Sequence, residues 1–243
     1  MRLRHIKGSE EEIEKSPWAY HSPEELQAAL KDSADGGDST DGTDSKSRDL
    51  ADGDCKAGLA DIRRPLYVEI GMGKGRFIMQ NAAAHPDIRY IGIEMYESVM
   101  VKATRKLDAM AEDEKPGNLR FIRMDARDIC DWFPEESVDR IYLNFSDPWP
   151  KTRHASRRLV SEAFLRRFRK VLKPGATVEF KTDNRDLFDF GLEEYEKAGF
   201  DAEYITYDLH HDQDAMKDNI MTEYEERFSA KGNPICKYIL RKI

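Results

Sequence analysis

The chain has 243 residues and a mass of 28.1 kDa; 35% of its residues are charged, 40% are apolar, and its mean hydropathy is −0.73. No apolar run approaches the ~20 residues that a membrane-spanning helix needs, so the composition argues against a transmembrane protein. The first twenty residues lack the apolar stretch of a secretory signal, and the three cysteines lie far apart. We therefore expect a cytoplasmic protein with no disulfide framework, no bound metal and no membrane partner.

The net charge of −8 is unevenly distributed. Residues 32–54 hold eight Asp against two basic residues and contain few apolar side chains. Such a segment cannot bury enough surface to offset its ordering entropy, so we expect it to be disordered. The chain is accordingly predicted to divide into an N-terminal arm (1–30), an acidic Asp/Gly/Ser-rich linker (31–61) and one folded domain (62–243).

A basic run occupies residues 151–173, where nine Lys and Arg stand against Glu162 alone. A local charge of +8 is typical of a surface that binds nucleic-acid phosphates. The simpler interpretation is a solvated helix face, because basic runs on helices are common.

Short apolar runs alternate with helix-period segments from residue 66 onward. The runs predict strands at Leu66–Ile70, Tyr90–Ile93, Leu119–Met124, Ile141–Phe145 and Thr177–Thr182. Between them, apolar residues at helical spacing predict helices near 77–84, 99–111, 164–172 and 187–195. The tail differs, because 202–207 and 235–241 predict an antiparallel strand pair with no clear helix between them. This order indicates an α/β fold with a parallel sheet covered on both faces and an antiparallel pair at one edge.

A glycine-rich turn closes the first strand of this sheet. The sequence runs from Glu69 through Gly71 and Gly73 to Gly75, directly before a predicted helix. Glycines at a strand-to-helix turn let the backbone approach a ligand closely. The spacing misses the Gly-x-Gly-x-x-Gly dinucleotide fingerprint, and Glu69 would repel a pyrophosphate. A cationic sulfonium ligand with an amino-acid tail fits better, which favours S-adenosylmethionine over NAD.

Two further carboxylates end the neighbouring strands. Glu94 closes the second strand, where a carboxylate can accept both hydroxyls of a ribose. Asp125 follows the third strand, within reach of an adenine amino group. Together with the turn they predict a nucleoside-binding edge of the sheet.

The fourth strand runs into Asn144-Phe-Ser-Asp-Pro-Trp-Pro-Lys151, across the crevice from the glycine turn. Two prolines stiffen this loop, Trp149 offers a stacking surface, and Asp147 and Lys151 offer opposite charges. Such a rigid loop is suited to positioning two reactants, and the alternative is a plain proline-rich turn.

Five segments of the chain resemble the bacterial tRNA (guanine-N7)-methyltransferases, the TrmB family. The similarity covers about residues 66 to 243, and the Ser-Asp-Pro-Trp-Pro-Lys segment is its most specific part. The segments are Glu69–Ile78, Tyr90–Glu94, Tyr142–His154, Phe180–Asn184 and Met221–Glu225.

The resemblance implies a class I, Rossmann-like S-adenosylmethionine-dependent methyltransferase with a mostly parallel seven-stranded sheet and an antiparallel edge strand. It implies S-adenosylmethionine as donor and guanine 46 in the variable loop of tRNA as acceptor. The residues that it places at the donor are Glu69, Gly71, Gly73, Glu94, Asp125 and Asp147. Those that it places at the target nucleotide are Lys151, Asp183, Thr222, Glu223, Tyr224 and Glu225. RNA contacts are implied for Arg153, His154, Arg157 and Arg158.

The chemistry of guanine N7 determines which catalytic groups the reaction needs. N7 carries a lone pair and no proton, so the reaction needs alignment rather than a general base. Positive charge moves onto the purine during transfer, and Asp147 is our candidate for stabilising it. Carboxylates at Asp183 and Glu225 suit the N1–H and N2–H₂ donors of guanine, although Asp183 also fits a helix N-cap.

Three alternatives remain open at this point. The first is an NAD-dependent oxidoreductase on the same type of sheet. The second is a non-catalytic RNA-binding protein with a retained donor pocket, and the third is a methyltransferase for another nucleic acid or a small molecule. The oligomeric state, monomer or homodimer, is also open.

Overall fold

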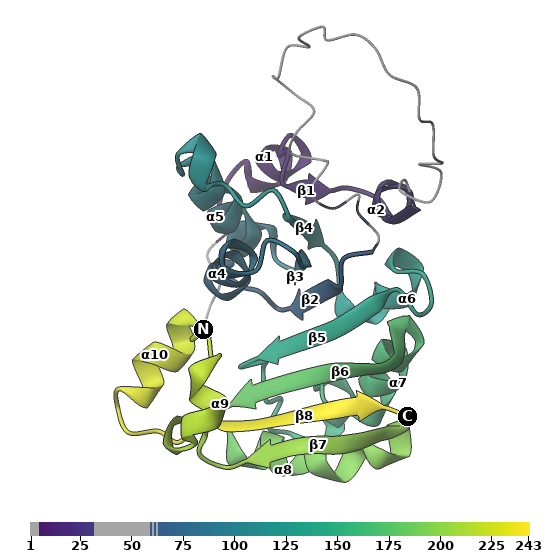
Figure 1. The fold of residues 1–243 in the computed structure, drawn as a ribbon, viewed down its shortest axis with the longest axis vertical. Coiled ribbons are helices and arrows are strands. Elements are labelled where there is room, and N and C mark those ends of the chain that lie inside the picture. Colours follow the sequence, from purple (N-terminus) through teal and green to yellow (C-terminus); the bar gives the residue numbers. More distant parts are fainter. Residues whose placement is uncertain (1–4, 32–58, 60, 62) are drawn as a thin grey trace, which may run out of the picture.

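The fold is an α/β sandwich around one mixed sheet (Figure 1). The computed structural model describes residues 5–31, 59, 61 and 63–243. The strands within these residues are β1 Ala19–Tyr20, β2 Leu66–Ile70, β3 Arg89–Glu94, β4 Leu119–Arg123, β5 Val138–Asn144, β6 Leu172–Thr182, β7 Phe200–Thr206 and β8 Cys236–Lys242. The helices are α1 Ser9–Glu14, α2 Pro23–Lys31, α4 Arg76–Ala84, α5 Glu97–Asp108, α6 Ile129–Trp132, α7 Glu162–Val171, α8 Arg185–Glu194, α9 Gln213–Lys217 and α10 Glu223–Ser229.

The sheet order is β1-β4-β3-β2-β5-β6-β8-β7. All pairs are parallel except those of β8, which runs antiparallel to both β6 and β7. The mostly parallel sheet with an antiparallel pair at one edge is thus confirmed, with two refinements. The antiparallel strand lies one position inside the edge, and β1 adds an eighth strand.

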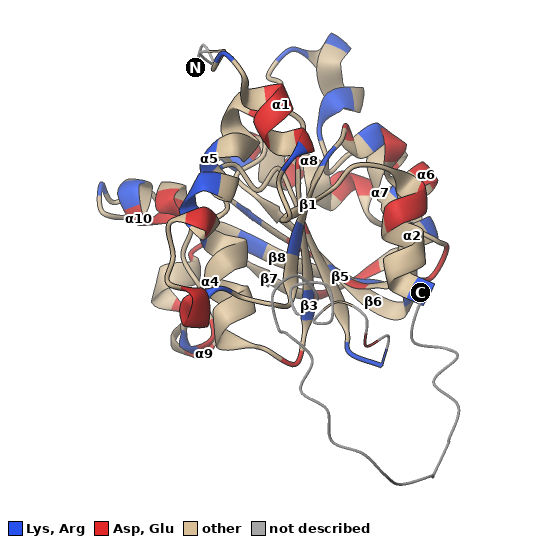
Figure 2. Cartoon of the chain, turned by 90° about the horizontal axis from the view of Figure 1, so that it is seen from above, with Lys and Arg blue, Asp and Glu red and all other residues tan. Residues whose placement is uncertain are grey.

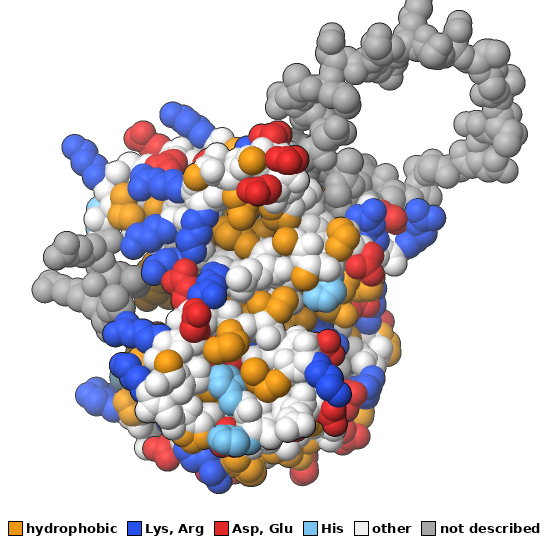
Figure 3. All heavy atoms as spheres, turned by 60° about the vertical axis from the view of Figure 1, so that its left-hand side comes forward, with side chains coloured by type: hydrophobic (Ala, Val, Ile, Leu, Met, Phe, Trp, Pro, Cys, Tyr) orange, Lys and Arg blue, Asp and Glu red, His pale blue; other side chains and the backbone are white. Residues whose placement is uncertain are grey.

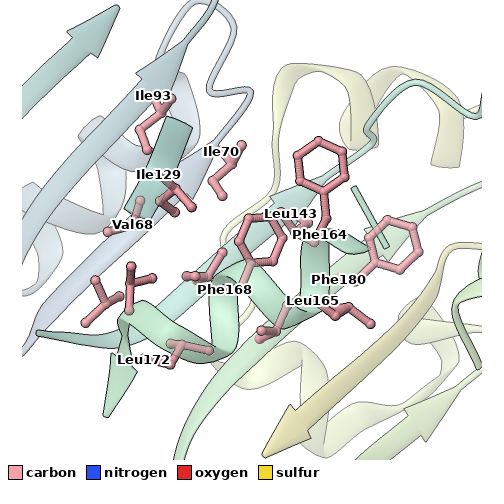
Figure 4. Packing of buried hydrophobic residues seen from close by; sticks show 14 of the residues in the cluster. Val68, Ile70, Ile93, Ile129, Leu143, Phe164, Leu165, Phe168, Leu172 and Phe180 are labelled. Atoms are coloured by element: carbon pink, nitrogen blue, oxygen red, sulfur yellow. The ribbon is translucent and has the colours of Figure 1, made fainter. Parts of the chain in front are cut away.

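Strand residues alternate between two apolar clusters because successive side chains of a strand point to opposite faces. Val68 and Ile70 of β2 pack with α2, α6, α7 and α8 on one face, where the aromatic side chains of α7 fill the space against β5 and β6 (Figure 4). Tyr90 of β3 and Tyr142 of β5 pack with α1, α4 and α5 on the other face. Coverage on both sides explains why the central strands consist almost entirely of apolar residues.

The N-terminal arm is part of this domain. Strand β1 pairs with β4, and α1, whose exposed face is acidic, packs on α5 (Figure 2). Trp18 is buried and donates its indole N–H to Asp108 at 2.8 Å. The predicted linker 31–61 lies almost entirely outside the described residues, but Leu59 within it is buried in the core. The core therefore begins before residue 62.

The segment between β7 and β8 corrects one prediction. We expected no helix there, whereas α9 and α10 fold over the carboxyl ends of the strands. Side-chain caps start both helices, at Asp212 and Thr222. Their lengths of five and seven residues are too short to produce an apolar periodicity, which is why the pattern did not reveal them.

Candidate donor and acceptor site

The glycine turn between β2 and α4 forms the floor of the candidate site. Gly71, Gly73 and Gly75 all have positive φ, at 76°, 59° and 74°. A Cβ at Gly75 would come within 3.1 Å of the Met79 side chain, whereas nothing lies within 4 Å of a Cβ at Gly71 or Gly73. The third glycine is therefore needed for helix packing, and the first two leave backbone open to a ligand.

Glu94 is held against this turn at the end of β3. Its carboxylate accepts the backbone N–H of Gly73 at 3.1 Å and of Tyr96 at 3.0 Å. Burial raises the pKa of Glu94, and these backbone bonds oppose the shift. Gly73 and Glu94, two of the residues predicted to bind the methyl donor, are thus adjacent.

Glu69 lies fully buried at the end of β2. One of its oxygens accepts Asn144 Nδ2 at 2.9 Å, and the other, Oε2, makes no hydrogen bond of standard geometry among the described residues, although the backbone N–H of Ile78 acts on the carboxyl group and lowers its pKa. Two neighbouring atoms of the β5 end, Asn144 Oδ1 and Ser146 Oγ, also have no hydrogen-bond partner among the described residues. Burial raises the pKa of Glu69 to about 7. Unpaired buried acceptors are costly, so this group calls for a hydrogen-bond donor from a ligand.

Asp125 and Asp147 are more exposed. Asp125 caps a short turn by accepting the Arg127 N–H at 2.9 Å and pairs with the Arg127 guanidinium at 2.7 Å. The hydrogen bond from Arg127 holds the pKa of Asp125 below its usual range. No hydrogen bond or ion pair engages Asp147 within the described part of the chain, so its carboxylate is available for a ligand.

The loop after β5 has a strained backbone. Phe145 and Trp149 both have positive φ, at 52° and 41°, which bulky residues adopt rarely. Arg158 braces the loop by donating to Pro148 O at 3.0 Å and Trp149 O at 3.1 Å. Arg158 is half-buried over Phe190, so its main contacts are structural and the predicted RNA contact is disfavoured.

The other predicted RNA-binding residues remain accessible. Arg153 and Arg157 are exposed, as is Lys151, which was predicted to contact the target nucleotide, and His154 packs edge-on against Trp149. The Arg157 guanidinium lies 5.0 Å from the Trp149 ring centroid. A cationic and aromatic loop of this kind suits contact with RNA.

Glu225 requires a correction. We predicted that it faces the target guanine, but its side chain is fully buried. One carboxylate oxygen binds the Lys181 ammonium at 2.8 Å, and the other accepts Asn219 at 2.8 Å and contacts His210 at 3.1 Å. Burial alone would raise the pKa of Glu225, yet these partners hold it below its usual value. Glu225 therefore holds α10 in place through Lys181, a buried partner that the sequence analysis did not identify.

Glu223 is likewise engaged within the protein. Its two oxygens pair with Lys74 of the glycine turn at 3.2 Å and with Lys106 of α5 at 3.0 Å. Arg76 pairs with Glu226 beside them. Figure 3 shows a face of the molecule on which basic and acidic side chains lie next to one another. These ion pairs connect α10 to α5 and to the glycine turn between β2 and α4, which is predicted to bind the methyl donor.

Asp183 and Tyr224 meet as predicted for a shared site. The Tyr224 hydroxyl donates to Asp183 Oδ2 at 3.3 Å, and Asn233 approaches the same oxygen at 3.5 Å. Thr222 accepts the Glu225 N–H and thereby caps α10. The sequence also allowed Asp183 to be an N-cap, but Asn184 takes that role for α8.

A cavity of 670 Å³ lies elsewhere, beneath α9 on the sheet face that carries Tyr142. Its polar floor includes the buried Glu179–Lys237 ion pair. None of the predicted donor or acceptor residues lines it. In the described part of the chain, no group of three His, Cys, Asp or Glu is placed to hold a metal ion, and no helix is long and apolar enough to cross a membrane.

Comparisons with known proteins agree with this geometry. Residues 63–238 match a family model described as "Putative methyltransferase". A tRNA (guanine-N(7)-)-methyltransferase of Lachnoclostridium phytofermentans is 44% identical over 98% of this chain and 97% of its own length. The enzyme of the same name from Bacillus subtilis is 45% identical over 71% of this chain and 78% of its own.

Solved structures support the fold alone. The 16S rRNA methyltransferase KamB superposes with a TM-score of 0.58 at 14% identity, covering 80% of this chain and 95% of its own. The aminoglycoside resistance methyltransferase NpmB1 gives 0.56 at 18% identity, covering 92% and 95%. With 44% identity to one tRNA (guanine-N(7)-)-methyltransferase over 98% of its length and a methyltransferase family model matched over residues 63–238, the chain belongs to the tRNA (guanine-N7)-methyltransferase family.

Proposed function

We propose that this protein transfers the methyl group of S-adenosylmethionine to N7 of guanine 46 in the variable loop of tRNA. The names of its relatives support the reaction class. The observation that carries the donor assignment is the buried, half-satisfied carboxylate of Glu69.

The unpartnered acceptors at Glu69, Asn144 and Ser146 suit the ammonium group of the donor's methionine part. An ammonium has three N–H donors and a positive charge, so it would satisfy these atoms and stabilise ionised Glu69. Glu94, already oriented by two backbone N–H groups, would accept the ribose hydroxyls. Asp125 would accept the adenine amino group, and the open backbone at Gly71 and Gly73 would lie beneath the ligand.

On the acceptor side, Asp183 is the carboxylate best placed to read the guanine. It accepts only long bonds from Tyr224 and Asn233, so it has capacity for the N1–H and N2–H₂ donors of guanine. An adenine lacks this pair of donors on its Watson–Crick edge. Lys151 and the exposed residues Arg153, His154 and Arg157 would bind the RNA around the target.

The proposed chemistry is an in-line displacement. When bound, the donor supplies a methyl group on a sulfonium; the N7 lone pair forms the new N–C bond as the C–S bond breaks, leaving a neutral thioether and a cationic purine. No proton is removed, so the chain needs no general base. The free carboxylate of Asp147 would stabilise the charge that develops on the purine.

The direct test incubates the protein with an unmodified tRNA transcript and methyl-labelled S-adenosylmethionine, followed by nucleoside analysis. We expect labelled 7-methylguanosine, and a transcript with adenine at position 46 should remain unlabelled. Label in another nucleoside, or equal label in both transcripts, would contradict the proposal.

A further inference from the structure

Three aromatic side chains form a column beside Asp183. Phe145 comes from the loop after β5, whereas Tyr224 and Phe228 lie one helical turn apart on α10. The ring centroids of Phe145 and Tyr224 are 4.8 Å apart at an interplanar angle of 36°. Those of Tyr224 and Phe228 are 4.1 Å apart at 17°. One tilted contact and one nearly parallel contact place Tyr224 in the middle of the column.

Lys181 fixes both parts of this column. Its carbonyl accepts the Phe145 N–H at 2.8 Å, and its buried ammonium holds Glu225 of α10. Phe145 is thereby kept at a positive φ, a conformation that is unfavourable for a bulky residue and persists only where its surroundings impose it. The column is therefore preorganised.

Attachment of α10 does not account for these rings. The helix is already held by the Glu225–Lys181 pair and by the Glu223 contacts to Lys74 and Lys106. An aromatic anchor would be buried, yet Tyr224 is 41% exposed. The outer ring also has a cationic border, since Lys231 Nζ lies 4.7 Å from the Phe228 centroid.

Exposed aromatic rings with neighbouring cations are typical of sites that bind unpaired bases. The column is next to Asp183, and Phe145 is two residues from Asp147. An enzyme that reacts at a base within structured RNA must present that base outside its stack, which requires a new stacking partner.

We propose that Phe145, Tyr224 and Phe228 form a stacking platform for an unpaired base of the RNA substrate at the reaction centre. This inference rests on the proposed function for the identity of the RNA. Stacking is insensitive to base type, so the platform supplies affinity and alignment while Asp183 supplies base selection.

The test uses a tRNA transcript with 2-aminopurine in place of guanine 46, because its fluorescence falls when the base stacks on an aromatic ring. We compare the wild type with Tyr224→Leu, Phe228→Leu and Tyr224→Phe. Tyr207→Leu is the matched control, because this ring is 45% exposed in the wild type and packs on Phe188 and Arg185 rather than on the column. Melting curves and S-adenosylhomocysteine binding verify that each variant is folded.

We expect the bound base to be quenched by the wild type, Tyr224→Phe and Tyr207→Leu, and to stay bright with the two leucine variants of α10. On guanine-containing tRNA, those two should lose about 5- to 150-fold in kcat/KM, the equivalent of one stacked base. If Tyr224→Leu and Phe228→Leu both quench the bound base as the wild type does and keep the wild-type kcat/KM, the platform proposal is wrong. The fluorescence result does not require turnover, so it stands apart from failure of the proposed reaction.

Discussion

The Lys181 ammonium and the Glu225 carboxylate lie 2.8 Å apart, and neither side chain is exposed to solvent. Lys181 also donates to Asn219 Oδ1 and Ile220 O, both at 3.1 Å, so all three of its N–H donors are used. This pair joins the end of the central sheet to the helix that carries Tyr224. Together with the Glu223 contacts to Lys74 and Lys106, this buried pair holds α10 against the sheet.

Removing one partner of that pair should be strongly destabilising. We expect Lys181→Met to lower the free energy of unfolding by about 3–5 kcal/mol, because it leaves a buried carboxylate unpaired. Adding Glu225→Gln should cost less than the sum of the two single changes. Urea denaturation measures both effects. The control is Arg185→Met, which breaks the exposed ion pair with Asp189 and should lower the free energy of unfolding by less than about 1 kcal/mol. A similarly small loss for Lys181→Met would contradict the stabilising role of the Lys181–Glu225 pair.

In the protein without ligand, ionisation of the buried Glu69 should lower the free energy of unfolding above neutral pH. Its pKa is raised to about 7 by burial, so between its ordinary pKa and 7 the folded state binds more protons than the unfolded state. Stability then falls as pH rises through this window, by up to about 3 kcal/mol.

The matching variant is Glu69→Gln, which cannot ionise. It should unfold at a higher temperature than the wild type at pH 8 and lose that advantage at pH 4.5, while binding S-adenosylhomocysteine poorly. Melting curves at the two pH values and calorimetry provide the measurements. An equal change in melting temperature at both pH values would show that Glu69 is not the titrating group.

Glu94→Ala should weaken donor binding and leave tRNA affinity nearly unchanged. The carboxylate is fixed by the Gly73 and Tyr96 amides, so its remaining acceptor sites face the donor edge. Calorimetry with S-adenosylhomocysteine and a filter-binding assay with tRNA separate the two effects. Unchanged affinity for S-adenosylhomocysteine would remove Glu94 from the site.

Arg157 and Arg158 are neighbours with different predicted roles. Arg157→Ala should weaken tRNA binding and lower the log–log salt slope by roughly 0.7 to 0.9, as expected for one lost phosphate contact. Arg158→Ala should instead lower the melting temperature, because it releases the carbonyls of Pro148 and Trp149. Salt titrations and melting curves on both variants distinguish the roles, and an unchanged slope for Arg157→Ala would identify it as a solvated side chain.

The central strands could be predicted from the sequence, whereas α10 could not. Strand β2 begins and ends where predicted, since a buried parallel strand is a continuous apolar run bounded by a glycine turn. Glu225 was misassigned because glutamate is rarely fully buried, and only the tertiary structure brings Lys181 to it. Strand β1 has two residues, too few for any pattern. Asp147 stays a prediction, made because it lies in the loop that follows β5.

The most direct test of the mechanism is the single-turnover rate of Asp147→Asn with saturating tRNA and S-adenosylmethionine. Asparagine keeps the size and one acceptor oxygen but removes the charge, so the loss should appear in turnover rather than in binding. We predict a rate about 100- to 1000-fold below that of the wild type, with tRNA affinity unchanged. A near-normal rate would contradict charge stabilisation by Asp147.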